Sequence, residues 1–383
     1  MHAGATLGKG GGKCNFGDAP PGARALKVAP GGFVLSLAGV DPVTHVLLGA
    51  TLGWAAFGRK LGRTAAGVGG LAAFAPDADV FIRSAADPLV TIEYHRGFTH
   101  ALAFAPVGAA AVAALWLVRP EWRRWARWRE LWLCAMLGYV SHALLDAATT
   151  YGTQLWWPLS RRREGWDLIA IVDPLFTVVL LAGLGAALWR SVRRPAAIVL
   201  GLAALYLAFG GVQQARALAA QRALAAARGH AIERHEAMPT LANNLVWRAL
   251  YEHEGRIYSD RIRVGWFSRA TVREGWSLPL VRAGALSAEE RARDRHGSFA
   301  RFAWFSDGWV GRSPVDATLL ADMRYTLSAE AFDPIWGIRF TAPDAAADVE
   351  WVSRSRDRKI APRELWREIS GGDERFRALN PAP

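Results

Sequence analysis

The chain has 383 residues, of which 52% are hydrophobic and only 21% are charged. This composition excludes a disordered protein, because disordered chains have too little apolar surface to form a core. With only two cysteines, Cys14 and Cys134, the chain also cannot be a disulfide-rich scaffold or build a cysteine-based zinc site. The net charge of +12 is spread along the chain and is not confined to one basic segment.

Charged residues are sparse in one half of the chain and common in the other. Residues 40–212 contain 27 charged side chains, whereas residues 213–383 contain 48. This contrast predicts a membrane-embedded helical domain over 40–212 and an extracytoplasmic α+β domain over 213–383. Residues 1–39 are rich in Gly, Ala and Pro. We expect them to be a disordered extension or to precede the true translation start.

Apolar stretches in the first half predict the membrane helices. A helix needs about 20 apolar residues to cross a bilayer, with about 17 as the lower end. The last four stretches meet or approach this length, while the first two are short and Gly-rich and could be re-entrant or packed inside the bundle. The predicted fold class is therefore an all-α multi-span bundle of about five to six helices, followed by a smaller α+β domain. The stretches are Val43–Phe57, Thr64–Ala75, Ala101–Val118, Leu131–Ala148, Ile169–Trp189 and Ala196–Gly211.

The second half has shorter and more polar patterns. Ala215–Arg228 is predicted to continue the last apolar helix beyond the bilayer, and Glu254–Gly255 is predicted to be a hairpin turn between two strands. Phe299–Phe305 is amphipathic and fits either a helix or a strand. The remaining predicted strand regions are Asn244–Tyr258, Ile262–Phe267, Leu319–Thr326 and Trp336–Thr341.

Loop charges predict the orientation of the bundle. Three alternate loops carry eleven basic residues, opposed only by Glu121 and Glu130, which places these loops in the cytoplasm by the positive-inside rule. Segments 76–100 and 149–168 and the tail would then face outward, although Arg161–Arg163 argues against this orientation. Anionic lipid headgroups account for basic residues beside spans, so nucleic acid is not an expected partner.

Histidine and aspartate side chains gather near the outer ends of the predicted spans. Ionisable groups in or beside a span cost several kcal/mol unless the protein uses them, so these residues are functional candidates. Imidazoles and carboxylates delivered by four segments to one side of a bundle can hold one or more divalent metals. The candidates are Asp41, His45, Asp77, Asp79, His95, His100, His142, Asp146 and Asp173.

The clearest motif is Ser-His-Ala-Leu-Leu-Asp at residues 141–146. His142 and Asp146 are four residues apart, so both project from one face of a helix. They could bind one cation together, or Asp146 could orient the imidazole of a ligating His142. They could also form an ordinary polar pair within a helical bundle.

Two loop motifs add further candidates. Asp77 and Asp79 follow an apolar helix after Pro76, which is also the composition of a simple helix-terminating turn. In the segment His95–His100, Thr99 could cap a helix and Arg96 could hold an anionic oxygen by a bidentate contact. The alternative for this segment is a chance surface cluster.

Two single residues have more ordinary interpretations. His45, on the first turn of the first helix, is by itself more often a packed polar residue than a metal ligand. Asp173 precedes Pro174 and would either cap a kinked helix or serve as a further ligand or base.

As a set, these motifs resemble the membrane-bound metal-dependent hydrolase family, which includes the YdjM inner-membrane proteins. The signatures are Asp41–His45, Pro76–Asp79, His95–His100 and Gly138–Asp146, followed by Thr150–Gly152, and they lie within residues 40–210. The resemblance implies a multi-pass protein of the bacterial inner membrane with a divalent metal site and hydrolase activity.

A more distant similarity links the motifs to zinc-dependent phospholipase C and P1 nuclease. The later His and Glu ligands of those enzymes have no match in this chain, so a complete three-metal site is not implied. The similarity implies that the metal ligands are His45, Asp77, His100, His142 and Asp146.

The leading hypothesis is an integral membrane metallohydrolase that acts on a phosphodiester or lipid-linked substrate at the outer membrane face. Zinc suits a mixed set of imidazole and carboxylate ligands, with manganese or magnesium as alternatives. Asp79 or His95 would act as general base, and Arg96 would stabilise a developing oxyanion.

Two other classes of function remain open. A transporter or proton relay would have titratable groups distributed through the bilayer and an inverted repeat. A non-catalytic envelope scaffold would hold a structural metal. The expected partner of the leading hypothesis is a membrane lipid or a lipid-linked substrate, and the sequence leaves the oligomeric state open.

Overall fold

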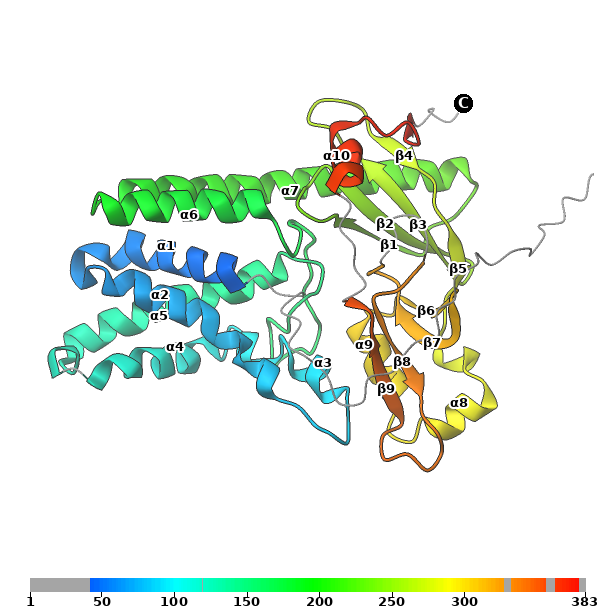
Figure 1. The fold of residues 1–383 in the computed structure, drawn as a ribbon, viewed down its shortest axis with the longest axis horizontal. Helices are drawn as coiled ribbons and strands as arrows, with labels where there is room; N and C mark the ends of the chain where they lie inside the picture. The colour runs from blue at the N-terminus through cyan, green and yellow to red at the C-terminus, as the bar shows by residue number, and fades with distance from the viewer. Residues whose placement is uncertain (1–41, 119, 327–331, 356–361, 379–383) are drawn as a thin grey trace, which may run out of the picture. The chain divides into compact units, whose positions relative to one another are not determined.

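The computed structural model describes residues 42–118, 120–326, 332–355 and 362–378. These residues form a helical region followed by a sheet-containing region (Figure 1), which confirms the predicted order of the two fold classes. The predicted extension over 1–39 and the candidate Asp41 lie outside the described residues.

Each of the six predicted apolar stretches contains a helix. Short helices connect the long ones at the end of the bundle where the candidate residues lie: η2 (Ala75–Phe81), α3 (Val90–Tyr94) and η3 (Phe98–His100). Two more 3₁₀ turns, η4 (Leu115–Val118) and η5 (Pro120–Trp122), precede α5. The long helices are α1 (Pro42–Leu61), α2 (Thr64–Phe74), α4 (Ala105–Ala114), α5 (Trp125–Ala147), α6 (Pro174–Trp189) and α7 (Arg194–Ala227).

Helix length alone identifies few membrane spans. Among the described residues, α7, with 34 residues, is the one helix that is long and apolar enough to cross a bilayer on its own. The pair Val90–His100 and Ala105–Val118, bent by 82°, would be a second span if both parts are counted together. The number of membrane crossings therefore stays a prediction.

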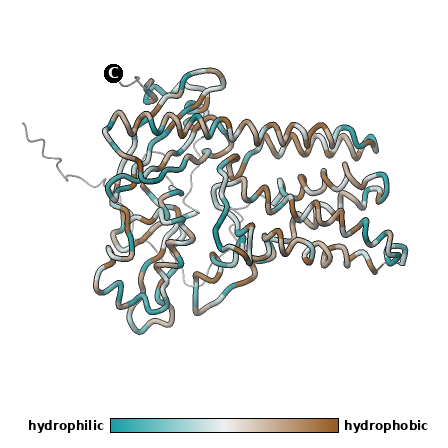
Figure 2. The backbone as a smooth tube through the Cα atoms, turned by 180° about the vertical axis from the view of Figure 1, so that it is seen from behind, coloured by the Kyte–Doolittle hydropathy of each residue, from teal (hydrophilic) through white to brown (hydrophobic). Residues whose placement is uncertain are grey.

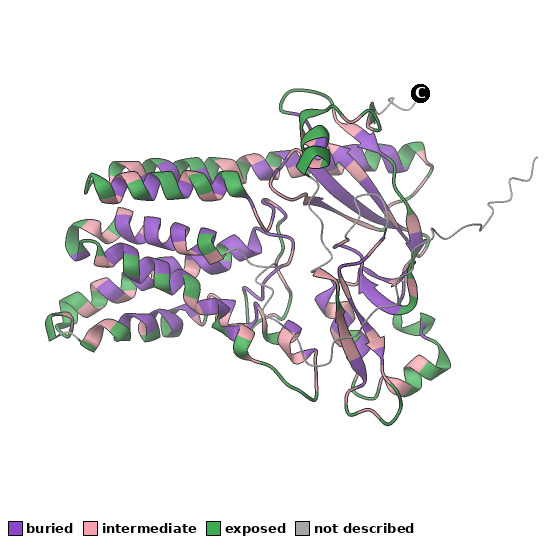
Figure 3. Cartoon of the chain, viewed as in Figure 1, coloured by how far each residue is buried: buried purple, intermediate pink, exposed green. Residues whose placement is uncertain are grey.

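The outer helices expose apolar side chains, whereas α1 is largely buried (Figures 2 and 3). Water-soluble proteins rarely expose extended apolar patches, so this distribution suits helices whose outer faces contact lipid. The exposed side chains on the helical region include Val107, Leu115, Leu133, Leu137, Leu144, Leu175, Val178, Leu181, Ile198, Leu202 and Leu205.

Three glycines let α1, α2 and α5 approach closely beside the candidate site. A Cβ atom added to Gly49 would lie 2.4 Å from the carbonyl oxygen of Gly69, and one added to Gly138 would lie 2.1 Å from the same oxygen. Small residues at such crossings allow backbones to pack directly against one another. Since α5 carries His142 and Asp146, this contact fixes the position of the helix that supplies two candidate ligands.

We expect Gly138→Ala to lower the free energy of unfolding by about 1–3 kcal/mol, because the added methyl group would meet a backbone oxygen that cannot rotate away. Gly185→Ala on α6 is the matched control, since no atom lies within 4 Å of its added Cβ. Thermal unfolding in detergent would compare the two. Equal midpoints for both variants would contradict the importance of this crossing.

The C-terminal region contains two antiparallel sheets. The six-stranded sheet has the order β1-β2-β3-β4-β10, with β5 paired to β3, and the four-stranded sheet has the order β6-β7-β8-β9. The first sheet consists of β1 (Arg234–Pro239), β2 (Val246–His253), β3 (Arg256–Arg263), β4 (Thr271–Arg273), β5 (Ser277–Pro279) and β10 (Arg377–Ala378). The second consists of β6 (Val310–Ser313), β7 (Asp316–Asp322), β8 (Trp336–Phe340) and β9 (Val349–Ser353). The helices of this region are η6 (Ala283–Ala285), α8 (Ala288–Arg293), α9 (Ser298–Phe305) and α10 (Pro362–Ser370).

Several predictions for this region are confirmed. Glu254 and Gly255 connect β2 to β3 with φ values of 48° and 66°, the left-handed pair expected of a tight hairpin turn. Phe299–Phe305 lies within a helix, α9, and not in a strand. The continuation of the last apolar helix over Ala215–Ala227 is part of α7.

The C-terminal region contacts the helical region through α7 and α9. The final turns of α7 pack on the first sheet through a core that includes Leu224, Trp247 and Ile262. On α9, Arg301 donates hydrogen bonds of 2.9 and 2.8 Å to the carboxylate of Glu93 on α3. The indole of Trp304 donates to the carbonyl oxygen of Arg161 at 3.2 Å. These contacts position α9 against the loops that surround the candidate site.

Candidate metal centre

Four of the five predicted metal ligands converge at one end of the bundle. Asp77 lies on η2, His100 on η3, and His142 and Asp146 on α5, and each offers one ligand atom within 4.8 Å of the others. His100, His142 and Asp146 are fully buried, and Asp77 is 9% exposed. Segments separated by up to 69 residues in sequence thus supply one compact group of potential metal ligands.

The hydrogen bonds of the two histidines determine which ring nitrogens face this group. His142 Nδ1 donates to the carbonyl oxygen of Ala73 at 2.6 Å. His100 Nδ1 lies 3.0 Å from the Thr99 hydroxyl oxygen, which donates its own proton to Asp79 and can therefore accept from Nδ1, and 3.2 Å from Asp79 Oδ2. In the neutral imidazole a protonated Nδ1 leaves Nε2 as an acceptor. The two Nε2 atoms face each other at 2.9 Å, so either one of them carries a proton that the other accepts, or both present lone pairs to a cation.

The carboxylates complete a set of acceptors. Asp146 Oδ2 lies 3.2 Å from each Nε2 atom, and Asp77 Oδ1 lies 3.6 Å from each. Ligands at about 2.0–2.1 Å from a tetrahedral zinc ion lie about 3.3 Å from one another, so the observed separations match the edges of a metal-binding tetrahedron. Neither Asp77 Oδ1 nor the two carboxylate oxygens of Asp146 makes a hydrogen bond with good geometry among the described residues. These buried acceptors fit a bound cation.

His45 lies beside this group without belonging to it. Its Nε2 atom is 3.2 Å from Asp146 Oδ1, the oxygen that does not face His100, and its ring centroid is 4.1 Å from that of His142. The guanidinium of Arg96 contacts the same oxygen, with Nη2 at 2.8 Å. Asp146 therefore faces the ligand group with one oxygen, while the other contacts His45 and a fixed positive charge.

Asp79 is the hydrogen-bonding centre of the site. Its carboxylate accepts from His95 Nδ1 at 2.8 Å, from the backbone N–H of Arg96 at 2.9 Å and from the Thr99 hydroxyl at 2.9 Å, besides its contact with His100. Thr99 does not cap η3, whose N-cap is Gly97, so the expected capping role is wrong. Its hydroxyl instead helps to hold the carboxylate that orients His95 and His100.

Arg96 adopts an unusual backbone conformation at the centre of the site. Its φ of 58° lies in the left-handed region, which non-glycine residues rarely adopt and which is often found at functional sites. The carbonyl oxygen of Arg96 accepts from the backbone N–H of Gln154 at 2.9 Å, and its Nη1 donates to the Thr149 hydroxyl at 3.0 Å. The loop after α5 thus holds both the backbone and the side chain of Arg96.

Tyr151 is a site residue whose role the sequence did not reveal. Its ring lies between two guanidinium groups, with Arg96 Cζ at 4.8 Å and Arg163 Cζ at 5.0 Å from the ring centroid. Burial raises the pKa of Tyr151, and burial lowers the pKa of Arg163 to about 10. Tyr151 and Arg163 also line a second cavity, which is described below.

Arg163 also explains part of an exception to the predicted charge distribution. Its Nη1 and Nη2 atoms donate to the carbonyl oxygens of His95 and Gly152 at 3.3 and 2.9 Å. Because its guanidinium donates to carbonyl oxygens within the protein, Arg163 stabilises the conformation of this loop. Arg161 and Arg162 of the same triplet still argue against the predicted orientation, and the Arg162 side chain is 79% exposed, so the orientation of the bundle stays a prediction.

Asp173 lies outside the group of potential ligands. One carboxylate oxygen accepts from the backbone N–H of Phe176 at 3.1 Å and caps α6, and the other accepts from the Tyr206 hydroxyl at 2.6 Å. The capping interpretation is confirmed, and the alternative role as ligand has no support from these contacts.

Comparison with known proteins finds a partial match to a bacterial protein. The chain is similar to the uncharacterized protein YfhP of Bacillus subtilis (strain 168), with 32% identity over 129 residues, which cover 33% of this chain and 37% of the relative. The matched segment thus spans little more than a third of that relative's length. No solved structure matches the chain.

The family comparison covers the helical region with its candidate ligands. The model of the YdjM inner membrane protein family matches residues 40–217. This range includes α1 to α6, most of α7 and every residue of the metal-ligand group. Residues 40–217 therefore match the YdjM inner membrane protein family, and this match does not extend to the sheet-containing region.

Proposed function

We propose that this protein is a multi-pass inner membrane hydrolase that uses one divalent metal, preferably zinc, to act on a phosphodiester of a lipid or lipid-linked substrate. The observation that carries the proposal is the pair of buried imidazole Nε2 atoms, 2.9 Å apart, with two carboxylates beside them. Lone pairs at this separation repel unless a cation or proton lies between them, and a divalent metal satisfies all four acceptors at once.

The arrangement favours a single metal. Asp77, His100, His142 and Asp146 would hold it, and His45 would contact the far oxygen of Asp146. Because the Arg96 guanidinium lies 2.8 Å from that oxygen, it supplies the positive charge that a second metal would otherwise provide. The mixture of imidazole and carboxylate ligands suits zinc, with manganese as an alternative.

The surrounding residues supply the other elements of hydrolysis. A bound divalent metal acts as a Lewis acid and lowers the pKa of a coordinated water to about 7. His95 is only partly buried, and Asp79 accepts from its Nδ1, so its Nε2 can take up a proton as a general base. Asp79 itself accepts bonds from several donors and is a positioning residue. Arg96 Nε has no partner among the described residues and is available to an anionic oxygen.

The exposed apolar faces support a substrate that comes from the membrane. Helices α4, α5, α6 and α7 all expose large apolar side chains, as lipid-facing helices would. The metal-ligand group is at one end of these helices instead of being distributed along them, which favours a catalytic site over a proton path through the bilayer. Lipid headgroups lie at the ends of membrane-spanning helices, so a headgroup could reach a site in this position.

The test is hydrolysis of phospholipid by the purified protein in mixed vesicles of phosphatidylethanolamine and phosphatidylglycerol. We expect zinc- or manganese-dependent release of the phosphorylated headgroup or of the headgroup alcohol, with activity reduced by about 10²-fold or more in His95→Gln, because the general base is lost. Release without added metal from a metal-free preparation, or no release with any divalent metal, would contradict the proposal.

A further inference from the structure

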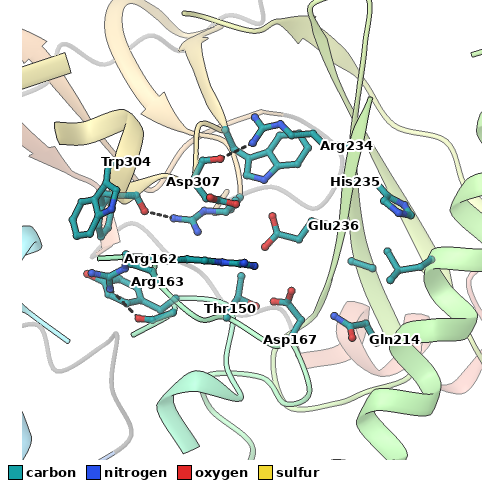
Figure 4. Close-up of a pocket in the computed structure, with 18 residues that line it drawn as sticks. Thr150, Arg162, Arg163, Asp167, Gln214, Arg234, His235, Glu236, Trp304 and Asp307 are labelled. Carbon is teal, nitrogen blue, oxygen red and sulfur yellow. Dashed lines mark hydrogen bonds between the residues drawn. The ribbon is translucent and has the colours of Figure 1, made fainter. Parts of the chain in front are cut away.

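A second cavity lies between the loop after α5, the last part of α7 and the C-terminal region (Figure 4). Its volume of about 290 Å³ is near the lower end of the range for small-molecule sites. Tyr151, whose ring contacts the Arg96 guanidinium, forms part of its wall, and the wall contains none of the proposed metal ligands.

Two carboxylates from different parts of the chain point into this cavity. Asp167 comes from the loop before α6, and Glu236 comes from β1 (Figure 4). Asp167 is only 4% exposed, and its Oδ1 atom has no hydrogen-bond partner among the described residues. Glu236 Oε2 is likewise buried and without a partner among them.

The groups around Asp167 and Glu236 do not fully neutralise the negative charges of these two carboxylates. Burial and the nearby charge of Glu236 raise the pKa of Asp167 well above its usual range. Burial raises the pKa of Glu236 to about 7, against the opposing effect of Arg324. Arg324 is already bound to Asp322 by a contact of 2.8 Å. A pair of buried acceptors in this state favours a ligand that brings hydrogen-bond donors and positive charge.

The wall also contains basic and aromatic side chains, together with a third carboxylate, that of Asp307. The Arg162 side chain is 79% exposed and reaches the cavity, while Arg163 has a buried Nε atom without a partner among the described residues. Trp304 and Trp309 add aromatic surface. Guanidinium groups bind phosphate, and aromatic faces attract organic cations.

We propose that this cavity binds a small zwitterionic ligand that carries a primary ammonium group and a phosphate. The ammonium group donates to Asp167 and Glu236, and the phosphate contacts Arg162 and Arg163. A divalent cation is a poorer occupant, because the guanidinium groups that line the cavity would repel a second concentrated positive charge. The ligand is either the headgroup of an aminophospholipid or a free phosphorylated amine.

The backbone at Asp167 agrees with a functional position. Its φ of 51° lies in the left-handed region, and such conformations cluster at ligand-binding and catalytic sites. Asparagine adopts this region more readily than most residues, so Asp167→Asn removes the negative charge without imposing a new backbone conformation. Glu236→Gln is the corresponding change on β1.

The experiment is calorimetric titration of the metal-free, full-length protein in detergent with phosphoethanolamine, compared with glycerol phosphate, which lacks the ammonium group. We expect phosphoethanolamine to bind at least tenfold more tightly. Asp167→Asn and Glu236→Gln should each abolish this preference, and Arg162→Gln should weaken the binding of both compounds. Glu289→Gln, at an exposed carboxylate of α8, is the matched control and should change nothing.

Several outcomes distinguish the source of the ligand or overturn the proposal. Competition by phosphatidylethanolamine but not phosphatidylglycerol in nanodiscs would identify a lipid headgroup, and binding of only the soluble compound would identify a free phosphorylated amine. Equal binding of phosphoethanolamine and glycerol phosphate, or stronger binding of calcium or magnesium at this cavity, would overturn the proposal. Because the protein is free of metal, these results do not depend on the proposed hydrolase activity.

Discussion

Replacing His142 with alanine is expected to reduce the bound divalent metal from about one equivalent per chain to almost none. The imidazole Nε2 atom lies 2.9 Å from that of His100 and 3.2 Å from Asp146 Oδ2, so it occupies one vertex of the ligand group. Three remaining ligands hold zinc far more weakly than four, and the buried carboxylates would lose the cation that compensates them. Mass spectrometry of the metal in protein purified in mild detergent measures this directly.

Asp146→Ala should have the same effect, because Asp146 Oδ2 faces both histidines. His296→Ala is the matched control: this imidazole is 69% exposed in the C-terminal region and contacts Asp348 instead of the metal centre. Both site variants must also unfold with a midpoint close to that of the wild-type protein. Otherwise the loss of bound metal would result from misfolding. Wild-type protein that binds no zinc or manganese even after reconstitution would exclude the metal centre.

Some of this site could be predicted from local sequence. The spacing of His142 and Asp146 determines that they share a helix face, and the structure places them beside one another at 3.2 Å. The position of Asp77 after Pro76 at a helix end likewise follows from local sequence. Which motifs would meet depends on packing, and in particular on the close contact between Gly69 and Gly138 that no periodicity reveals.

The roles of individual residues were harder to predict than their presence. Asp79 and His95 appeared as equivalent candidates for a base, but only the fold shows that Asp79 accepts hydrogen bonds from three groups around it and contacts His100 as well. Tyr151 appeared only as part of the Thr150–Gly152 signature, and its role comes from the two guanidinium groups that lie near its ring. Contacts between distant segments determine these roles.

The elements of the fold, like the site residues, were predictable only where local sequence specifies them. Apolar stretches predicted the positions of the long helices, and the Glu254–Gly255 turn predicted the hairpin. The strand β1, with the sequence RHEAMP, has little apolar alternation and was not predicted. It forms because every one of its residues pairs with β2, a partner that local sequence does not specify.

Asp79→Asn is expected to weaken metal binding by about 10- to 100-fold without abolishing it, because residues that orient ligating histidines typically contribute this much. The carboxylate accepts from His95 Nδ1, the Arg96 N–H and the Thr99 hydroxyl, and it lies 3.2 Å from His100 Nδ1. An asparagine amide replaces one accepting oxygen with an N–H₂ group that can only donate. One or two of these bonds must break, so the His100 ring would lose its fixed tautomer and orientation.

Rescue by metal distinguishes this positioning role from direct ligation. Since all four ligands of the metal-ligand group remain in Asp79→Asn, excess zinc should restore full occupancy, whereas His142→Ala should stay empty at the same concentration. Asp87→Asn is the matched control, because this exposed carboxylate pairs with Arg301 on α9 and not with a histidine. Binding curves from a competitive zinc indicator would give the affinities. Wild-type affinity in Asp79→Asn, or loss that excess zinc cannot restore, would show that orientation by Asp79 is not what makes His100 a ligand.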